Sequence, residues 1–117
     1  MPDHGPADEV LPPMCATYTR AFDIIGRRWT GPILRALMSG NTRFNELGRA
    51  IPGLSDRLLS ERLKELESEG LVIRTVTPST PVRIEYRLTE MGAALLPALV
   101  AVEQWATKWI TPDRMTA

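Results

Sequence analysis

The feature that most constrains the fold is a change of hydrophobic period near Gly70. Before it, Leu59, Leu63 and Leu66 fall within a narrow arc of a helix that turns about 100° per residue. After it, residues 82–88 (VRIEYRL) alternate strictly between apolar and charged, which is typical of a half-buried strand. Residues 71–76 are the expected antiparallel partner. Because such a small hairpin is not stable alone, it is expected to pack on helices.

The helix before the hairpin has sequence signals at both ends. Ser55 is a good N-cap, since its hydroxyl accepts a hydrogen bond from a backbone N–H of the first turn, and Asp56 suits the positive helix end. Gly70 can take the left-handed conformation that ends a helix. A helix over residues 55–69 is therefore predicted.

Further helices are predicted on both sides of this unit. Thr89 is expected to cap a last helix, which Pro97 either kinks or restarts. Three helices precede residue 53, where Pro52 and Gly53 form a turn. Their apolar faces are Tyr18, Phe22 and Ile25, then Ile33, Leu34, Leu37 and Met38, then Phe44, Leu47 and Ile51.

This order predicts a mainly α (α+β) fold, a winged helix-turn-helix with a two-stranded wing and dimerisation helices at both ends. The folded domain is expected over residues 15–110. Residues 1–14, acidic and proline-rich, are expected to be a flexible tail, and residues 111–117 a C-terminal tail.

In such a fold the second helix of the motif enters the DNA major groove. Residues 42–50 would be the supporting helix and residues 55–69 the recognition helix. Arg57 can contact guanine, Ser60 either base type, Glu61 cytosine and Lys64 a phosphate. A solvated amphipathic face is the alternative interpretation.

The wing carries further arginines. Arg83 and Arg87 are expected on its outward face, with Arg74 on the facing strand, beside the minor groove or a phosphate. Cross-strand ion pairing with Glu85 is the alternative.

Composition limits the other function classes. With 14 basic and 14 acidic residues the net charge is zero, although residues 20–43 hold five arginines against Asp23 alone. No apolar run is long enough to span a membrane and no signal core is present, so a cytoplasmic protein is expected. One cysteine, and one histidine (His4) in the tail, predict no disulfide framework, metal site, cofactor or enzyme active site.

The terminal helices carry more apolar surface than a small monomer needs, which favours a homodimer. A two-fold dimer would place two recognition helices about one DNA turn apart. The candidate dimerisation residues are Tyr18, Phe22, Leu95, Leu99, Val102, Trp105 and Trp109.

Five motifs in order, IGRRW, RFNEL, IPGLS, LSERLKELE-EGL and EYRLT-MG, make residues 15–109 resemble the HxlR family of bacterial winged-helix transcription regulators. The resemblance implies a homodimer that binds double-stranded DNA and regulates nearby genes. Asp56 and Glu61 depart from the glutamines common in relatives, and Thr80-Pro81-Val82 stands where a Pro-Pro pair is common. The DNA-contacting positions that it implies are Arg43 and Asn45, then Ser55, Arg57, Ser60 and Arg62, and Arg83 in the wing.

Cys15 matches a cysteine that senses oxidants or electrophiles in some members of that family. A thiol at a helix N-terminus, with Arg20 about a turn away, is expected to have a lowered pKa. The alternative role is a small buried residue in the dimer core.

Two other functions remain open. A small aromatic effector would lodge between Phe22, Trp29 and the terminal tryptophans, and a winged helix can also serve as a protein-interaction adaptor.

Overall fold

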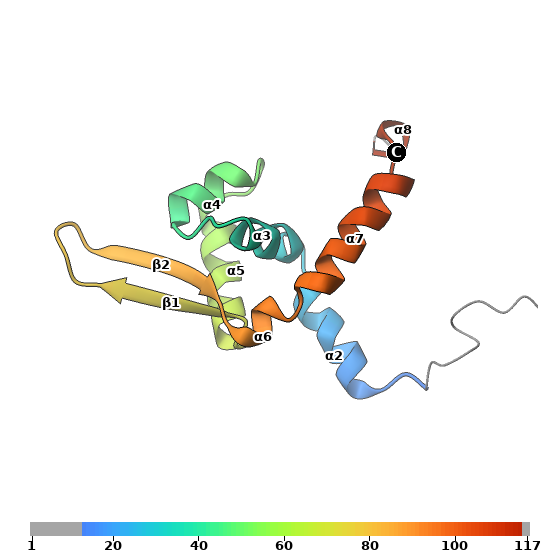
Figure 1. Cartoon of the computed structure of the whole chain (residues 1–117), viewed down its shortest axis with the longest axis horizontal. Coiled ribbons are helices and arrows are strands. Elements are labelled where there is room, and N and C mark those ends of the chain that lie inside the picture. Colours follow the sequence, from blue (N-terminus) through green and yellow to red (C-terminus); the bar gives the residue numbers. More distant parts are fainter. Residues whose placement is uncertain (1–12, 116–117) are drawn as a thin grey trace, which may run out of the picture.

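The computed structural model describes residues 13–115. The predicted winged helix-turn-helix is confirmed: helices dominate and one two-stranded antiparallel sheet forms the wing (Figure 1). Residues 1–12 of the predicted N-terminal tail and residues 116–117 lie outside the described part. The elements are α2 (Ala16–Ile25), α3 (Thr30–Met38), α4 (Phe44–Ala50), α5 (Asp56–Ser68), β1 (Val72–Thr77), β2 (Arg83–Leu88), α6 (Glu90–Ala93), α7 (Leu96–Trp109) and α8 (Pro112–Met115).

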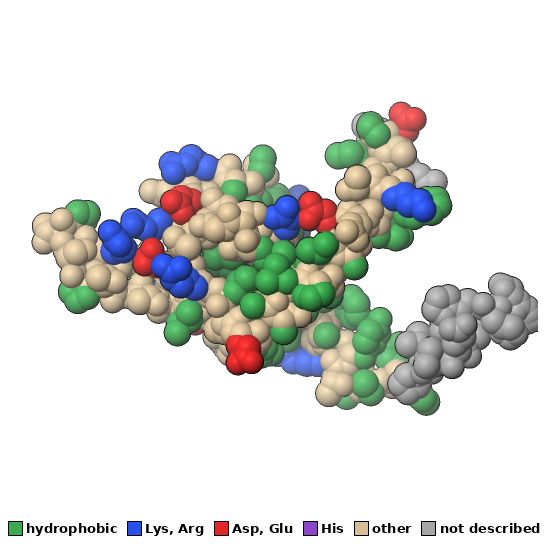
Figure 2. Space-filling view, viewed as in Figure 1, with side chains coloured by type: hydrophobic (Ala, Val, Ile, Leu, Met, Phe, Trp, Pro, Cys, Tyr) green, Lys and Arg blue, Asp and Glu red, His purple; other side chains and the backbone are tan. Residues whose placement is uncertain are grey.

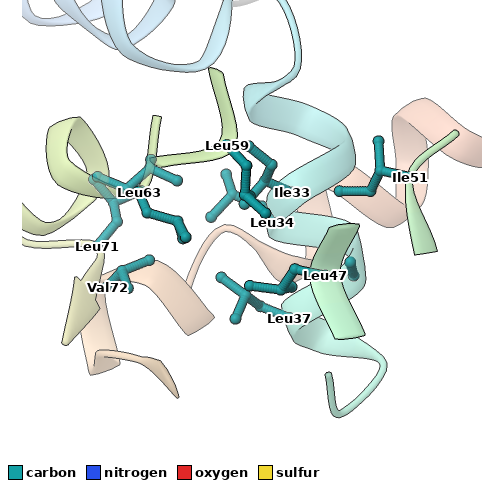
Figure 3. Close-up of a cluster of buried hydrophobic side chains, with 11 residues drawn as sticks. Ile33, Leu34, Leu37, Leu47, Ile51, Leu59, Leu63, Leu71 and Val72 are labelled. Carbon is teal, nitrogen blue, oxygen red and sulfur yellow. The ribbon is translucent and has the colours of Figure 1, made fainter. Parts of the chain in front are cut away.

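The core lies where α3, α4, α5 and the start of β1 meet (Figure 3). The apolar arc predicted for α5 is buried there, with Leu59, Leu63 and Leu66 each at most 2% exposed. Burying them removes apolar surface from water, which is the main force that holds α5 in place. Its partners are Ile33, Leu34, Ala36 and Leu37 of α3, Leu47 of α4, and Ile51, Leu71 and Val72.

Both ends of α5 form as their residues predict. The Ser55 hydroxyl accepts a hydrogen bond from the Leu58 N–H at 3.1 Å. At the other end Gly70 has φ of 85°, and the N–H groups of Gly70 and Leu71 donate to the carbonyls of Glu67 and Leu66. This Schellman arrangement satisfies two carbonyls of the last turn and turns the chain into β1.

The register of the wing decides which side chains share a face. Val72 pairs with Leu88, Arg74 with Tyr86 and Val76 with Ile84. Because directly paired residues point to the same side, Arg74 lies on the face of Tyr86 and not on that of Arg83 and Arg87. Arg74 is thus on the facing strand, as predicted, but its side chain is on the opposite face from the two outward arginines.

The hairpin is also less buried toward its tip than the alternation suggests. Val82 precedes β2 and is 58% exposed, since the wing tip extends beyond the helices (Figure 1).

Pro97 marks a division of the last helix. Thr89 caps α6, with its hydroxyl accepting from the Gly92 N–H at 3.0 Å, and α6 ends at Ala93. A second helix, α7, begins at Leu96 with Pro97 in its first turn, where the missing N–H costs no hydrogen bond. Figure 1 shows α7 leading away from the body and diverging from α2, at the end opposite the wing. Within residues 13–115, no helix is long and apolar enough to cross a membrane.

Candidate nucleic-acid interface

The face of α5 opposite the leucines carries the polar residues predicted to contact DNA. Arg57 lies in the first turn, and its side chain is 88% exposed. Glu61 and Lys64 follow on the same face and are also exposed, while Ser60 is half-buried at its edge. Ser55 uses an oxygen lone pair in the cap and keeps its hydroxyl proton to donate. The start of α5 therefore offers both donors and acceptors to solvent.

Arg57 and Glu61 form an ion pair one helical turn apart. The Arg57 Nε lies 3.2 Å from a Glu61 carboxylate oxygen. Exposed pairs of this kind contribute little to stability, because both charges stay hydrated. The pair therefore aligns the guanidinium along α5 while leaving it free to exchange Glu61 for another acceptor.

Arg62 is placed differently from the other residues predicted to contact DNA. Its side chain is 16% exposed and turns toward the junction of α2 and α3. There its Nε donates to the Arg28 carbonyl at 3.0 Å. The resemblance grouped Arg62 with the DNA-facing positions, but at 100° per residue it flanks the buried arc formed by Leu59 and Leu66.

The supporting helix begins two residues later than predicted, at Phe44. The Glu46 carboxylate accepts hydrogen bonds from the backbone N–H of Thr42 at 2.9 Å and of Arg43 at 3.0 Å. These two bonds, the one from Thr42 foremost, lower the pKa of Glu46 below its ordinary value. Asn45 is exposed on the same helix. Glu46 therefore fixes the start of α4 and the backbone position of its N-cap residue, Arg43.

The base of the wing joins α4 through one carboxylate. Glu85 lies 4.0 Å from the Arg43 Nε and 3.4 Å from an Arg87 nitrogen. The Tyr86 N–H also donates to the Thr42 carbonyl at 2.8 Å. The predicted pairing of Arg87 with Glu85 thus exists, but along one strand and not across two, because both residues belong to β2.

Arg83 lies nearer the wing tip, opposite Thr77, and is exposed. Figure 2 shows basic side chains gathered over the wing with acidic ones among them. The structure thus brings Arg43 and Arg87 together and leaves Arg83 apart.

The candidate dimerisation residues fall into two groups. Leu95 and Leu99 are half-buried and pack against the core. The others are exposed on α2 and α7, where Figure 2 shows apolar side chains along both helices. Tyr18 and Phe22 form an edge-to-face pair with ring centres 5.2 Å apart. The exposed fractions of this second group are 56% for Tyr18, 53% for Phe22, 60% for Val102, 58% for Trp105 and 52% for Trp109.

Cys15 is exposed directly before α2. Its sulfur lies 3.0 Å from the Thr17 hydroxyl, and this hydrogen bond, followed by one from the Tyr18 backbone, lowers the pKa of the thiol. The predicted direction is confirmed, but the cause is not Arg20. The Arg20 guanidinium pairs instead with Glu69, the residue directly after α5, at 2.5 Å.

The aromatic residues suggested for an effector pocket are not gathered within one chain. Phe22 and Trp105 are each more than half exposed, and α7 leads away from α2 (Figure 1). Trp29 is half-buried elsewhere, in a hollow of about 420 Å³ that it lines with Pro32, Arg35, Ala36, Ser39, Asn41, Ala50, Ile51 and Pro52.

Sequence reasoning missed the contacts around Glu46 and Glu65. The signal for Glu46 was present, because an acid three residues after the N-cap is the usual partner of the N-cap backbone. Glu65 binds Arg27, which lies 38 residues earlier, and no local pattern indicates such a pair.

Known proteins match this sequence across most of the chain. The family model for the HxlR-like helix-turn-helix matches residues 24–114. The uncharacterized HTH-type transcriptional regulator YvaP of Bacillus subtilis is 54% identical over 100 residues, covering 86% of this chain and 93% of YvaP. The HTH-type transcriptional regulator YodB of the same organism is 43% identical over 99 residues, covering 85% of this chain and 88% of YodB.

Solved structures agree with these sequence matches. The reduced form of YodB superposes with a TM-score of 0.74 at 43% identity, covering 85% of this chain and 97% of that one. The redox regulator HypR in its oxidized form gives a TM-score of 0.75 at 34% identity, covering 80% of this chain and 96% of the HypR chain. This chain therefore belongs to the HxlR-like helix-turn-helix family and is a DNA-binding transcription regulator of the winged helix-turn-helix type.

Proposed function

We propose that this regulator acts as a homodimer on a two-fold symmetric operator, with α5 of each subunit in the major groove of one half-site. The observation that carries the proposal is the exposed start of α5, where Arg57 is 88% exposed on the face opposite the buried leucines. Recognition helices of this motif read bases with their N-terminal residues.

The side chains suit distinct contacts. Arg57 can donate two hydrogen bonds to guanine O6 and N7, while Ser60 and Glu61 can contact the neighbouring bases. Lys64, farther along α5, suits a phosphate. The other residues that we propose as contacts to the DNA backbone are Ser55 at the start of α5, Arg43 and Asn45 at the start of α4, and Arg83 and Arg87 of the wing.

The homodimer is supported by the exposed apolar residues of α2 and α7. Tyr18, Phe22 and Trp105 are each more than half exposed, and large aromatic side chains left in water favour a partner surface. A second copy supplies the same surface related by a two-fold axis. Such a dimer would place the two α5 helices about 34 Å apart, the spacing of two half-sites. It would act where the chromosome is, in the cytoplasm.

We further propose that Cys15 makes DNA binding sensitive to oxidants or electrophiles. The thiol is exposed and its pKa is lowered, both of which favour the reactive thiolate. Solved relatives include diamide-treated and quinone-bound YodB and both redox forms of HypR. Since Cys15 is the one cysteine of the sequence, oxidation would give a Cys15–Cys15′ bridge, a mixed disulfide or a sulfenic acid.

Selection from a random double-stranded DNA library, at physiological salt with thiols reduced, tests the first proposal. We expect a symmetric motif with its halves about one turn apart. If a folded protein enriched no motif, sequence-specific binding would be refuted and a protein-adaptor function favoured.

Titrating the protein with diamide or a quinone, and following its binding to the selected site, tests the second proposal. We expect binding to change in the parent protein and not in Cys15→Ser. Equal responses of the two proteins would exclude Cys15 as the sensor.

A further inference from the structure

The turn between α2 and α3 (residues 26–29, hereafter the α2–α3 turn) contacts the recognition helix in a way that the proposed DNA contacts do not explain. Trp29 in this turn has φ of 79°, the one non-glycine residue in the described chain with a positive value. A bulky residue keeps this left-handed conformation only where its surroundings impose it. The α2–α3 turn that holds Trp29 makes two groups of contacts, one with the middle of α5 and one with the segment just before α5.

The first contacts form a closed polar network around the middle of α5. The Arg62 Nε donates to the Arg28 carbonyl at 3.0 Å, and an Arg62 Nη lies 3.3 Å from Glu65. The Arg27 guanidinium reaches the same Glu65 carboxylate at 2.5 Å. The α2–α3 turn is therefore tied to α5 by a backbone carbonyl and by a side chain at once.

The second contact lies just before α5. The outer edge of the Trp29 ring is 3.5 Å from the position that a Cβ on Gly53 would take, and the Arg28 guanidinium covers the ring at 4.8 Å. Gly53 belongs to the turn of the helix-turn-helix, so the same short segment holds α5 near its beginning and near its middle.

We infer that Arg62 is a positioning residue for DNA recognition and not a DNA contact. The inference rests on the proposed function of the outward face of α5. Leucine packing holds α5 to the core without strong directionality, whereas the guanidinium fixes its partners in a planar geometry. Arg62 therefore sets the rotation of α5 about its axis, and with it the direction in which Arg57 points.

Binding to the selected site as a function of salt tests this role in Arg62→Gln, Arg62→Lys and, as the matched control, Lys64→Gln on the same helix. We expect Arg62→Gln to weaken specific binding about tenfold, as for a lost charged hydrogen bond, with an unchanged log–log salt slope. Lys64→Gln should lower that slope by about 0.9. Arg62→Lys should not restore binding, because an ammonium cannot reproduce the fork.

A salt slope that falls by about 0.9 in Arg62→Gln, together with recovery in Arg62→Lys, would make Arg62 a phosphate contact and overturn the inference. Thermal unfolding verifies that each variant is folded. If Arg62→Gln does not fold, Arg27→Gln decides, since Arg27 lies on the turn: weaker specific binding with an unchanged slope supports the inference, and parent-like binding refutes it.

Amide hydrogen exchange of the free protein separates this inference from the proposed function. We expect the amides of α5 to exchange at least several-fold faster in Arg62→Gln than in the parent, while Lys64→Gln leaves them unchanged. Failure of the parent to bind any DNA site would refute the proposed function, and the exchange rates would still test whether Arg62 positions α5. Unchanged exchange in Arg62→Gln would refute the positioning role alone.

Discussion

Arg57 and Lys64 lie on the same exposed face of α5 but suit different parts of DNA. Arg57 is in the first turn, where recognition helices meet base edges, and it pairs with the exposed carboxylate of Glu61. Lys64 lies two turns later on α5, where we expect the helix to run beside the phosphates. We therefore expect the two residues to contribute differently to affinity and specificity.

We predict that Arg57→Ala costs about 1–3 kcal/mol on the selected site and relaxes its sequence preference. The physical reason is the loss of a two-point contact to guanine. Fluorescence anisotropy on the selected site and on single-base variants measures both quantities. Lys64→Ala is the control, and it should weaken binding to all DNA sequences by a similar factor. If Arg57→Ala also weakened binding to all sequences equally, the base contact would be contradicted.

The reactivity of Cys15 depends on a neighbouring hydroxyl. The Thr17 side chain is the main cause of the lowered thiol pKa, so thiolate is populated at a lower pH than in a free cysteine, and reactivity rises as the pH passes through the lowered pKa. We predict that Thr17→Val moves the midpoint of Cys15 alkylation to higher pH, measured from rates with iodoacetamide. Thr19→Val is the control, because that hydroxyl donates to the Cys15 carbonyl and not to its sulfur.

At the scale of elements, α6 docks on the end of α5 through a close backbone approach. The Thr89 hydroxyl donates to the Gly70 carbonyl at 2.6 Å, and the Thr89 N–H donates to the Leu71 carbonyl at 3.0 Å. A Cβ on Gly92 would lie 2.1 Å from that same Leu71 carbonyl oxygen. Position 92 therefore has no room for a side chain, and α6 orients both the wing and α7.

We predict that Gly92→Ala destabilises the fold by about 1–3 kcal/mol, because backbone must move to remove the overlap. Gly31→Ala is the matched control: Gly31 is in helix α3, and a Cβ there meets nothing within 4 Å. It should be neutral or stabilising by about 0.5–1 kcal/mol. Urea unfolding of both variants measures the difference, and equal stabilities would show that α6 can shift without cost.

At the scale of the whole molecule, the wing and the two terminal helices extend from opposite ends of one small core (Figure 1). The core, formed mainly by α3 and α5, leaves the aromatic residues of α2 and α7 in solvent. In the proposed dimer, a subunit with this shape would offer one end to DNA and the other to a second copy.

We predict that Trp105→Ala weakens the dimer about 30-fold or more, as for an aromatic residue central to an interface, while leaving the fold of the subunit intact. Sedimentation equilibrium measures the dissociation constant. Thr107→Ala is the control, since Thr107 lies on another side of α7 and its hydroxyl donates to the Glu103 carbonyl. If the dimer of Trp105→Ala had the same dissociation constant as the parent dimer, the interface would have to lie elsewhere.

Most elements of this fold were predictable from local patterns. The leucine spacing, the Ser55 cap and the Gly70 terminus specify α5 through interactions that span only a few residues. The alternation around Tyr86 likewise predicts β2. The polar face of α5 follows from the same periodicity, so Arg57, Glu61 and Lys64 were expected on its outside.

Tertiary structure decided what depends on partners distant in the chain. The register of β1 on β2 puts Arg74 on the same face of the wing as Tyr86. The Arg62 side chain donates to the Arg28 carbonyl, 34 residues away, and so lies toward the core and not in solvent. Arg20 likewise pairs with Glu69, 49 residues away, and the Thr17 hydroxyl is the main cause of the lowered pKa of Cys15. Sequence period specifies which side of an element faces the core, because packing repeats with the backbone. The partner of an arginine depends on which segments meet in space, and only the assembled fold determines that.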